Sequence, residues 1–219
     1  MTSPSEPRGE RAAATGPNQR LVAATLQLLQ GETPTDLTVR RIATAAGTTT
    51  MAVYTGFGSR DGLLDVVYAQ GFEQLRERLA PAALVADPAD AVLQLLGAYR
   101  TFALANPGLY GLLFERVVPG FDPSPEARRT ALDSTFGLLA AQAGRLLATD
   151  PQDKASRSLA YTLWALTHGL VSLELSHAGR SPLAHPVLAE TDGQDVLDTA
   201  LRAALAGWSS PSSRTTSAR

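Results

Sequence analysis

Residues 37–60 read Leu-Thr-Val-Arg-Arg-Ile-Ala-Thr-Ala-Ala-Gly-Thr-Thr-Thr-Met-Ala-Val-Tyr-Thr-Gly-Phe-Gly-Ser-Arg. A helix-turn-helix needs a small residue where its two helices touch, a glycine in the turn and an apolar anchor in the second helix. Ala43, Gly47 and Val53 meet these needs at spacings of four and six residues. The segment therefore predicts a helix-turn-helix, a motif that either binds DNA or simply forms a corner in an all-α protein.

The ends of the two expected helices can also be assigned. Thr38 is placed to cap the first helix and Thr49 the second, because a threonine oxygen can accept a hydrogen bond from an amide of the first turn. Gly47 can adopt the left-handed conformation that ends the first helix. The second helix, about residues 49–56, would present these side chains to a DNA major groove: Thr49, Thr50, Met51, Tyr54 and Thr55.

The same segment carries a local positive charge. It holds Arg40, Arg41 and Arg60 and no acidic residue, whereas the whole chain has 19 basic and 21 acidic residues and a net charge of −2. The overall balance excludes a protein that coats nucleic acid through charge alone. A short positive segment suits the phosphates of one site on DNA, and Arg40 is a candidate contact.

Prolines divide the rest of the chain into helix-length runs, because proline is tolerated in the first turn of a helix and disfavoured inside one. The 14 prolines leave runs at 18–33, 35–80, 89–106, 126–150, 152–181 and 187–210. An N-cap residue precedes a proline at Asp87-Pro88, Ser124-Pro125 and Asp150-Pro151. Residues 117–124 and 179–190 read as loops. No stretch shows the alternation expected of strands, so the predicted fold is all-α with about nine helices.

Several motifs follow one another between residues 18 and 80. They are Arg20-Leu21-Val22-Ala23-Ala24-Thr25-Leu26, Thr38-Val39-Arg40-Arg41-Ile42-Ala43, Ala46-Gly47-Thr48, Val53-Tyr54-Thr55-Gly56-Phe57-Gly58-Ser59-Arg60 and Leu63-Leu64. In this order they resemble the DNA-binding domain of the TetR family of transcriptional regulators, with its three-helix arrangement. The resemblance implies that Thr38, Tyr54 and Arg60 contact phosphates. It also implies that the groove is lined by Thr49, Thr50, Met51 and Thr55.

Two positions depart from the pattern of that family. The family commonly has a histidine or an aromatic residue where this chain has Gly56, and often a larger polar or aromatic residue in place of Thr55. The second helix therefore lacks the arginine, asparagine and glutamine side chains that read bases through two hydrogen bonds. We expect sparse base readout, to which the shape of the DNA contributes.

The C-terminal part shows a looser resemblance. Residues 163–175 and 106–114 resemble a regulator domain named for its Trp, His and Gly. Such a domain binds a small effector and forms a homodimer through its last two helices, here about 151–178 and 191–207. We therefore expect a disordered tail at 1–16, a DNA-binding domain at 17–62, a connecting helix at 63–80, an effector-binding and dimerisation domain at 81–208 and a second tail at 209–219.

Aromatic residues of this second domain are candidates for an effector pocket, since pockets are mostly apolar with a few polar anchors. The candidates are Tyr99, Phe102, Tyr110, Phe114, Phe136, Tyr161 and Trp164, with His168 as the polar anchor. Each of them can equally belong to the ordinary core. Few charged residues lie near these positions, which favours a neutral, hydrophobic or aromatic effector.

Other functional classes find little support. The chain has no cysteine, and its three histidines lack metal-ligand spacing, so we expect no metal site and no cofactor. Phosphate-binding, dinucleotide and nucleophile motifs are missing, and we expect no enzymatic activity. The uncharged stretch 158–173 would span roughly 24 Å as a helix, short of a bilayer. With no signal peptide at the N-terminus, we expect a cytoplasmic protein without a membrane partner.

The sequence thus predicts a one-component transcriptional regulator. We expect a repressor that binds a near-palindromic DNA operator as a homodimer and responds to a small effector. Two alternatives share these features. One is an activator of the same fold, and the other is a helical sensor or interaction protein whose N-terminal motif no longer binds specific DNA.

Overall fold

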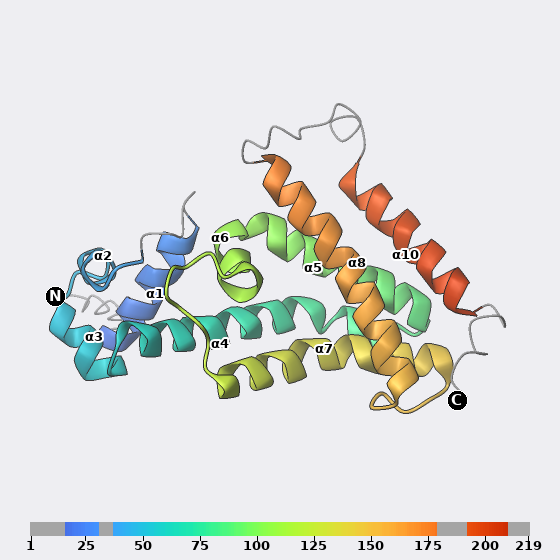
Figure 1. Cartoon of the computed structure of the whole chain (residues 1–219), viewed down its shortest axis with the longest axis horizontal. Coiled ribbons are helices and arrows are strands. Elements are labelled where there is room, and N and C mark those ends of the chain that lie inside the picture. The colour runs from blue at the N-terminus through green and yellow to red at the C-terminus, as the bar shows by residue number, and fades with distance from the viewer. Residues whose placement is uncertain (1–15, 31–36, 179–191, 210–219) are drawn as a thin grey trace, which may run out of the picture.

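The computed structural model describes residues 16–30, 37–178 and 192–209. These residues form nine α-helices, one 3-10 turn and one π-helical turn, and no strand (Figure 1). The elements are α1 (Pro17–Leu29), α2 (Val39–Ala45), α3 (Thr50–Phe57), α4 (Arg60–Leu79), η2 (Ala82–Leu84), α5 (Pro88–Ala105), α6 (Pro107–Tyr110), η3 (Gly111–Glu115), α7 (Pro125–Leu147), α8 (Lys154–Ala178) and α10 (Gly193–Ser209). The prediction of an all-α fold is confirmed.

Helices α1, α2 and α3 pack on one another, and α1 and α3 also pack on α4. Their shared core contains the fully buried side chains of Leu21, Ile42, Val53, Leu63 and Leu64. Figure 1 shows these three helices at one end of the molecule, with α4 extending from them toward the remaining helices. The expected boundary between residues 62 and 63 therefore falls inside one continuous helix.

The larger part of the protein is built on α4, α5, α7 and α8. Helix α4 packs on α5 and α7, while α8 packs on α5 and α7. Helix α10 lies along α8 and also contacts α5, so that α8 and α10 form one flank of the molecule (Figure 1). None of the helices in the described ranges is both long and apolar enough to cross a membrane.

Two of the three predicted proline-adjacent caps are confirmed. The Asp87 carboxylate accepts hydrogen bonds from the amides of Ala89 and Asp90, both at 2.9 Å. The Ser124 hydroxyl accepts one from the amide of Ala127 at 3.2 Å. In both helices the following proline occupies the first turn, where its missing amide hydrogen costs nothing.

The third predicted cap, at Asp150, is wrong. Helix α8 begins at Lys154, and Asp150 instead closes a turn in which its carboxylate accepts from the amide of Gln152 at 2.7 Å. The Asp153 amide donates to the Asp150 carbonyl oxygen at 3.0 Å in the same turn. The chain reverses direction between α7 and α8, and this reversal uses residues 148–153.

The predicted loop at 117–124 is non-helical, as expected. It begins after Arg116, which has a left-handed backbone with a φ of 53°. The predicted loop at 179–190 and nearly all of the two expected tails lie outside the described residues.

Candidate DNA-binding surface and effector cavity

The turn between α2 and α3 has the geometry expected from its sequence. Gly47 has a φ of 61°, and its amide donates to the Thr44 carbonyl at 3.1 Å. The Thr48 amide donates to the Ala43 carbonyl at 2.9 Å. These two bonds are the Schellman pattern, which satisfies the last carbonyls of a helix and favours glycine at the left-handed residue. The predicted role of Gly47 is confirmed.

The two predicted threonine caps differ. The Thr38 hydroxyl accepts a hydrogen bond from the Arg41 amide at 3.3 Å and caps α2. Thr49 occupies the N-cap position of α3, but its side chain makes no capping bond, so the expectation that it does is wrong. The Thr49 side chain is exposed, and the buried side chain of α3 is that of Val53.

The outer face of α3 is unusually apolar for an exposed surface. Met51 is 67% exposed and Tyr54 51% exposed, on a helix of eight residues. Thr49, Thr50 and Thr55 are exposed as well, and so is Arg40 on α2. The arrangement thus leaves all of the expected groove-facing side chains accessible to a partner.

Gly56 lies close to the end of the Asn18 side chain. A Cβ atom built on Gly56 would lie 2.2 Å from Oδ1 of Asn18. Asn18 lies on α1 and is exposed, so a larger residue at position 56 would require the Asn18 side chain to turn aside. No sequence pattern indicates this contact, because the two residues are far apart in the chain.

Arg60 does not extend freely from the molecule. Its Nε donates to the Leu37 carbonyl oxygen at 2.7 Å, and its Nη1 donates to the Pro119 carbonyl oxygen at 3.3 Å. Nη1 also lies 3.6 Å from Oδ1 of Asp61, and the side chain is 25% exposed. The expected phosphate contact is thus already bonded to two distant parts of the backbone.

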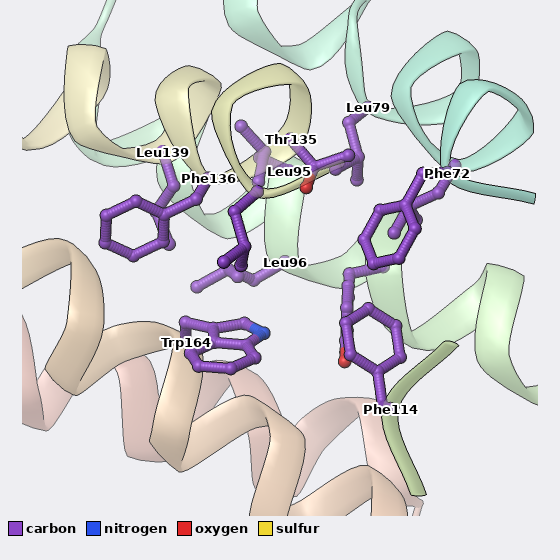
Figure 2. A pocket seen from close by; sticks show the side chains of 12 residues that line it. Phe72, Leu79, Leu95, Leu96, Phe114, Thr135, Phe136, Leu139 and Trp164 are labelled. Atoms are coloured by element: carbon purple, nitrogen blue, oxygen red, sulfur yellow. The ribbon is translucent and has the colours of Figure 1, made fainter. Parts of the chain in front are cut away.

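A cavity lies between α4, α5, η3, α7 and α8 (Figure 2). Its lining residues are Phe72, Leu75, Leu79, Leu95, Leu96, Tyr99, Phe114, Leu132, Thr135, Phe136, Leu139 and Trp164. Its volume is about 30 Å³, room for about two water molecules. Among the residues that the structure describes, no charged side chain lines it, and the Thr135 hydroxyl donates to the Ala131 carbonyl of its own helix.

The predicted pocket residues divide between this wall and its surroundings. Tyr99, Phe114, Phe136 and Trp164 line the cavity, and Figure 2 shows the rings of Phe114, Phe136 and Trp164 around it. Phe102, Tyr110 and His168 do not line it. The exposed Tyr161 instead packs edge-on against Trp164, with ring centroids 5.9 Å apart.

Polar groups form a network beside the cavity. Nδ1 of His168 lies 2.8 Å from the Tyr110 hydroxyl and 3.1 Å from the Tyr99 hydroxyl. The Tyr110 hydroxyl also lies 3.2 Å from the Ser172 hydroxyl, which donates to Glu115 at 2.8 Å. The Ser172 hydroxyl, the two phenols and the imidazole thus form one connected chain of hydrogen bonds that ends on Glu115.

Burial sets the protonation states in this network. Desolvation raises the pKa of Tyr99 and that of Tyr110, so both phenols keep their protons. Desolvation lowers the pKa of His168, although the Glu115 carboxylate opposes this effect. His168 is therefore neutral at pH 7, and the charged group of this network is the exposed Glu115 carboxylate, which does not line the cavity.

The sequence matches two family descriptions. Residues 21–67 match "Bacterial regulatory proteins, tetR family", and residues 92–191 match "Tetracyclin repressor-like, C-terminal domain". The chain belongs to the TetR family of transcriptional regulators. The first match contains the whole of α2 and α3, and the second contains most of the cavity wall.

Two curated relatives come from Mycobacterium tuberculosis. The uncharacterised HTH-type transcriptional regulator Rv0681 is 27% identical over 158 residues, which are 72% of this chain and 70% of that protein. The HTH-type transcriptional regulator Rv1816 is 35% identical over 98 residues, 43% of this chain and 41% of that protein.

Solved structures agree on the fold. A protein of unknown function from Rhodococcus sp. RHA1 superposes with a TM-score of 0.70 at 23% identity, over 88% of this chain and 95% of that one. The TetR family regulator PfmR from Thermus thermophilus gives a TM-score of 0.56 at 18% identity, over 85% and 96%. Identities this low establish the shared fold and no shared ligand.

In this TetR-family regulator, helix α4 supplies part of the cavity wall through Phe72, Leu75 and Leu79. These three residues were not among the predicted pocket residues, although their spacing places them on one face of a helix. The same helix begins at Arg60, immediately after the helix-turn-helix. One rigid element thus joins the cavity to the DNA-binding region.

A groove between α7 and α8 adjoins the cavity. The two share Leu132, Phe136 and Trp164, and the groove has a volume of about 740 Å³. The rings of Phe136 and Trp164 meet edge-on, with centroids 6.5 Å apart. These two rings thus lie at the border between the cavity and the groove.

Proposed function

We propose that the protein is a repressor that binds a near-palindromic operator as a homodimer and is released by a small, neutral, apolar or aromatic effector. The observation that carries this proposal is the span of α4. The helix begins with Arg60 beside the helix-turn-helix and lines the effector cavity with Phe72, Leu75 and Leu79. A ligand that displaces α4 would therefore also displace the DNA-binding helices.

The exposure of α3 supports DNA as the partner. Met51 and Tyr54 are large side chains left uncovered, flanked by threonines and by the exposed Arg40. Methionine and threonine methyl groups can contact the methyl group of thymine, and tyrosine and arginine can bind phosphates. This set of side chains predicts modest base readout, with a contribution from the shape of the DNA.

The exposed face of α8 supports a homodimer. It carries mostly small residues at helical spacing: Ser158, Thr162, Ala165, Gly169, Leu173 and Ser176. A Cβ atom at Gly169 would meet nothing within 4 Å in the protomer, and Leu173 is 56% exposed. Small residues let two helices approach closely, so a second copy packed along α8 and α10 would cover this face.

The cavity supports a neutral, apolar effector. No charged side chain of the described residues lines it, and it shares the aromatic side chains of Phe136 and Trp164 with the adjoining groove. At about 30 Å³ the cavity is far smaller than a ligand site of about 300–1,000 Å³. The effector would therefore bind a rarer, opened state in which Phe136 and Trp164 have moved apart, and would shift the population toward it.

Two measurements test the proposal. Selection of bound sequences from random duplex DNA should return a site with two related half-sites about 10 base pairs apart or multiples of that spacing. A thermal-shift survey of small compounds should give stabilisation by neutral aromatic or aliphatic molecules, and those molecules should weaken operator binding. A promoter carrying the selected site should be less active when the protein is present. Failure to select any sequence would favour a sensor without specific DNA binding, and stabilisation by highly charged compounds alone would contradict the effector class.

A further inference from the structure

The Arg60 guanidinium joins two segments that are 82 residues apart in the chain. Nε bonds the carbonyl of Leu37, and Nη1 bonds the carbonyl of Pro119. A planar guanidinium can hold two acceptors in fixed directions, which the single ammonium group of lysine does not do. Arg60 therefore fixes the distance between the segment that precedes α2 and the loop that precedes α7.

A cation at this position needs such partners. Arg60 is the first residue of α4, where the free amides of the helix create a positive potential. The carboxylate of Asp61, at 3.6 Å, offsets part of this repulsion. Within the described residues, Nη2 of Arg60 has no bonded partner, so donors are left for a DNA phosphate.

The Pro119 end of this link leads to the cavity. Phe114 forms part of the cavity wall and lies in η3, a π-helical turn that ends at Arg116 with its left-handed backbone. The loop then buries Val118, and it is tied again to α4 because the Ser124 amide donates to Oδ1 of Asp65 at 3.1 Å. Single π-helical turns often occur at functional sites, and a change in η3 would move Pro119.

The Leu37 end leads to the DNA-binding helices. Leu37 is buried, and it directly precedes Thr38, the cap of α2. The Thr38 hydroxyl and carbonyl accept from the amides of Arg41 and Ile42, at 3.3 Å and 3.0 Å. The position of Leu37 thus sets the position of the first turn of α2.

We propose that Arg60 is a positioning residue that transmits movement of the cavity wall at Phe114, through the Pro119 carbonyl, to the first turn of α2 and to the phosphate-binding donors of Arg60 itself. The link is a property of the protein without DNA or effector, and its regulatory meaning rests on the proposed function. A residue that only binds phosphate would leave the free protein unchanged when it is replaced.

Hydrogen exchange of the full chain, without DNA or effector, tests the link. Arg60→Lys keeps the charge and removes the two-carbonyl bridge. We expect exchange to rise about three- to tenfold in residues 116–124 and at the amides of Arg41 and Ile42, the equivalent of one lost hydrogen bond. The matched control is Arg40→Lys, an exposed arginine of α2, which should leave both segments unchanged. No increase in residues 116–124 for Arg60→Lys would overturn the proposal.

A double-mutant cycle tests the transmission. Phe114→Leu trims the cavity wall and should raise exchange in residues 116–124 and in the first turn of α2. In the Arg60→Lys background the response of α2 should disappear while that of residues 116–124 remains. An equal α2 response in both backgrounds would overturn the inference.

A second variant, which frees the loop 116–124 in another way, keeps the proposal testable if Arg60→Lys does not fold. Asp65→Ala frees the loop at Ser124 and keeps the Arg60 bridge, so Phe114→Leu should still reach α2, and its failure to do so would count against the proposal. None of these measurements uses DNA. If the coupling is seen in a protein that selects no operator, this inference stands and the proposed function is refuted. If the protein selects an operator but shows no coupling, the proposed function stands and this inference is refuted.

Discussion

Phe72 of α4 and Phe114 of η3 meet edge to face, with ring centroids 5.3 Å apart and planes at 70°. Both rings line the cavity, and Phe72 also packs on Tyr68 at 4.9 Å. The helix that carries the DNA-binding region and the turn that begins the Pro119 loop thus share one aromatic contact. Any ligand that enters the cavity has to compete with it.

Phe72→Leu should lower the free energy of unfolding by about 1–2 kcal/mol, because the side chain is buried and loses edge contacts worth about 0.5–1.5 kcal/mol each. Denaturant unfolding measures the change. The control is Leu84→Ala, at a side chain that is 87% exposed, which should stay within about 0.5 kcal/mol of the unchanged protein. Equal effects of the two substitutions would mean that the cavity wall is already loosely packed.

Protonation of His168 should make the protein less stable in mild acid. Burial lowers the pKa of His168 in the folded state below its ordinary value of 6.5. The unfolded chain then binds the proton more tightly, so the stability that the neutral imidazole contributes is present above pH 6.5 and is lost as the pH falls. Between pH 7.5 and pH 5, the free energy of unfolding should fall less for His168→Gln than for the unchanged protein. Identical slopes for the unchanged protein and His168→Gln would refute the assignment.

Gly169 offers a test of the dimer face. If α8 faces solvent, Gly169→Ala should raise the free energy of unfolding by about 1 kcal/mol, because alanine is the better helix former and its Cβ atom would meet nothing within 4 Å. In a dimer packed closely along α8 the added methyl group should instead shift the equilibrium toward the monomer. Gly137→Ala on α7, which also has open space, should stabilise the protein without changing its oligomeric state. Sedimentation equilibrium distinguishes the outcomes, and an unchanged dimer for Gly169→Ala would place the interface elsewhere.

Local backbone chemistry explains which features could be predicted from the sequence. Gly47 is favoured because a left-handed backbone costs least where no Cβ atom is present, and Asp87 and Ser124 cap helices because their oxygens reach nearby amides. Such effects act over a few residues and are visible in a short stretch of sequence. Asp150 shows their limit, because the path of the chain between α7 and α8 decided where the helix could begin.

The features that the sequence did not indicate depend on long-range packing. Asn18 fills the space beside Gly56, and Arg60 bonds the carbonyl of Pro119, yet neither residue type demands such a partner. The contribution of Phe72 to the cavity follows from how α4 packs on α5 and α7, which no periodicity reveals. Composition and spacing therefore predicted the all-α architecture and four of the five aromatic residues of the cavity wall, whereas the link between the two regions depends on long-range packing.

Tyr54 and Met51 should separate phosphate binding from base reading. Tyr54 is a candidate phosphate contact, so Tyr54→Phe should weaken binding by a similar factor for every sequence variant of the selected operator. Met51→Ala should instead weaken binding mainly where a thymine methyl group is lost, and it should leave the salt dependence unchanged. Both side chains are at least half exposed, so the fold should tolerate either change. Binding isotherms across operator variants and salt concentrations provide the measurement. A steep, base-specific loss for Tyr54→Phe would reverse the two roles, and similar losses at many base pairs in the unchanged protein would rule out sparse base readout.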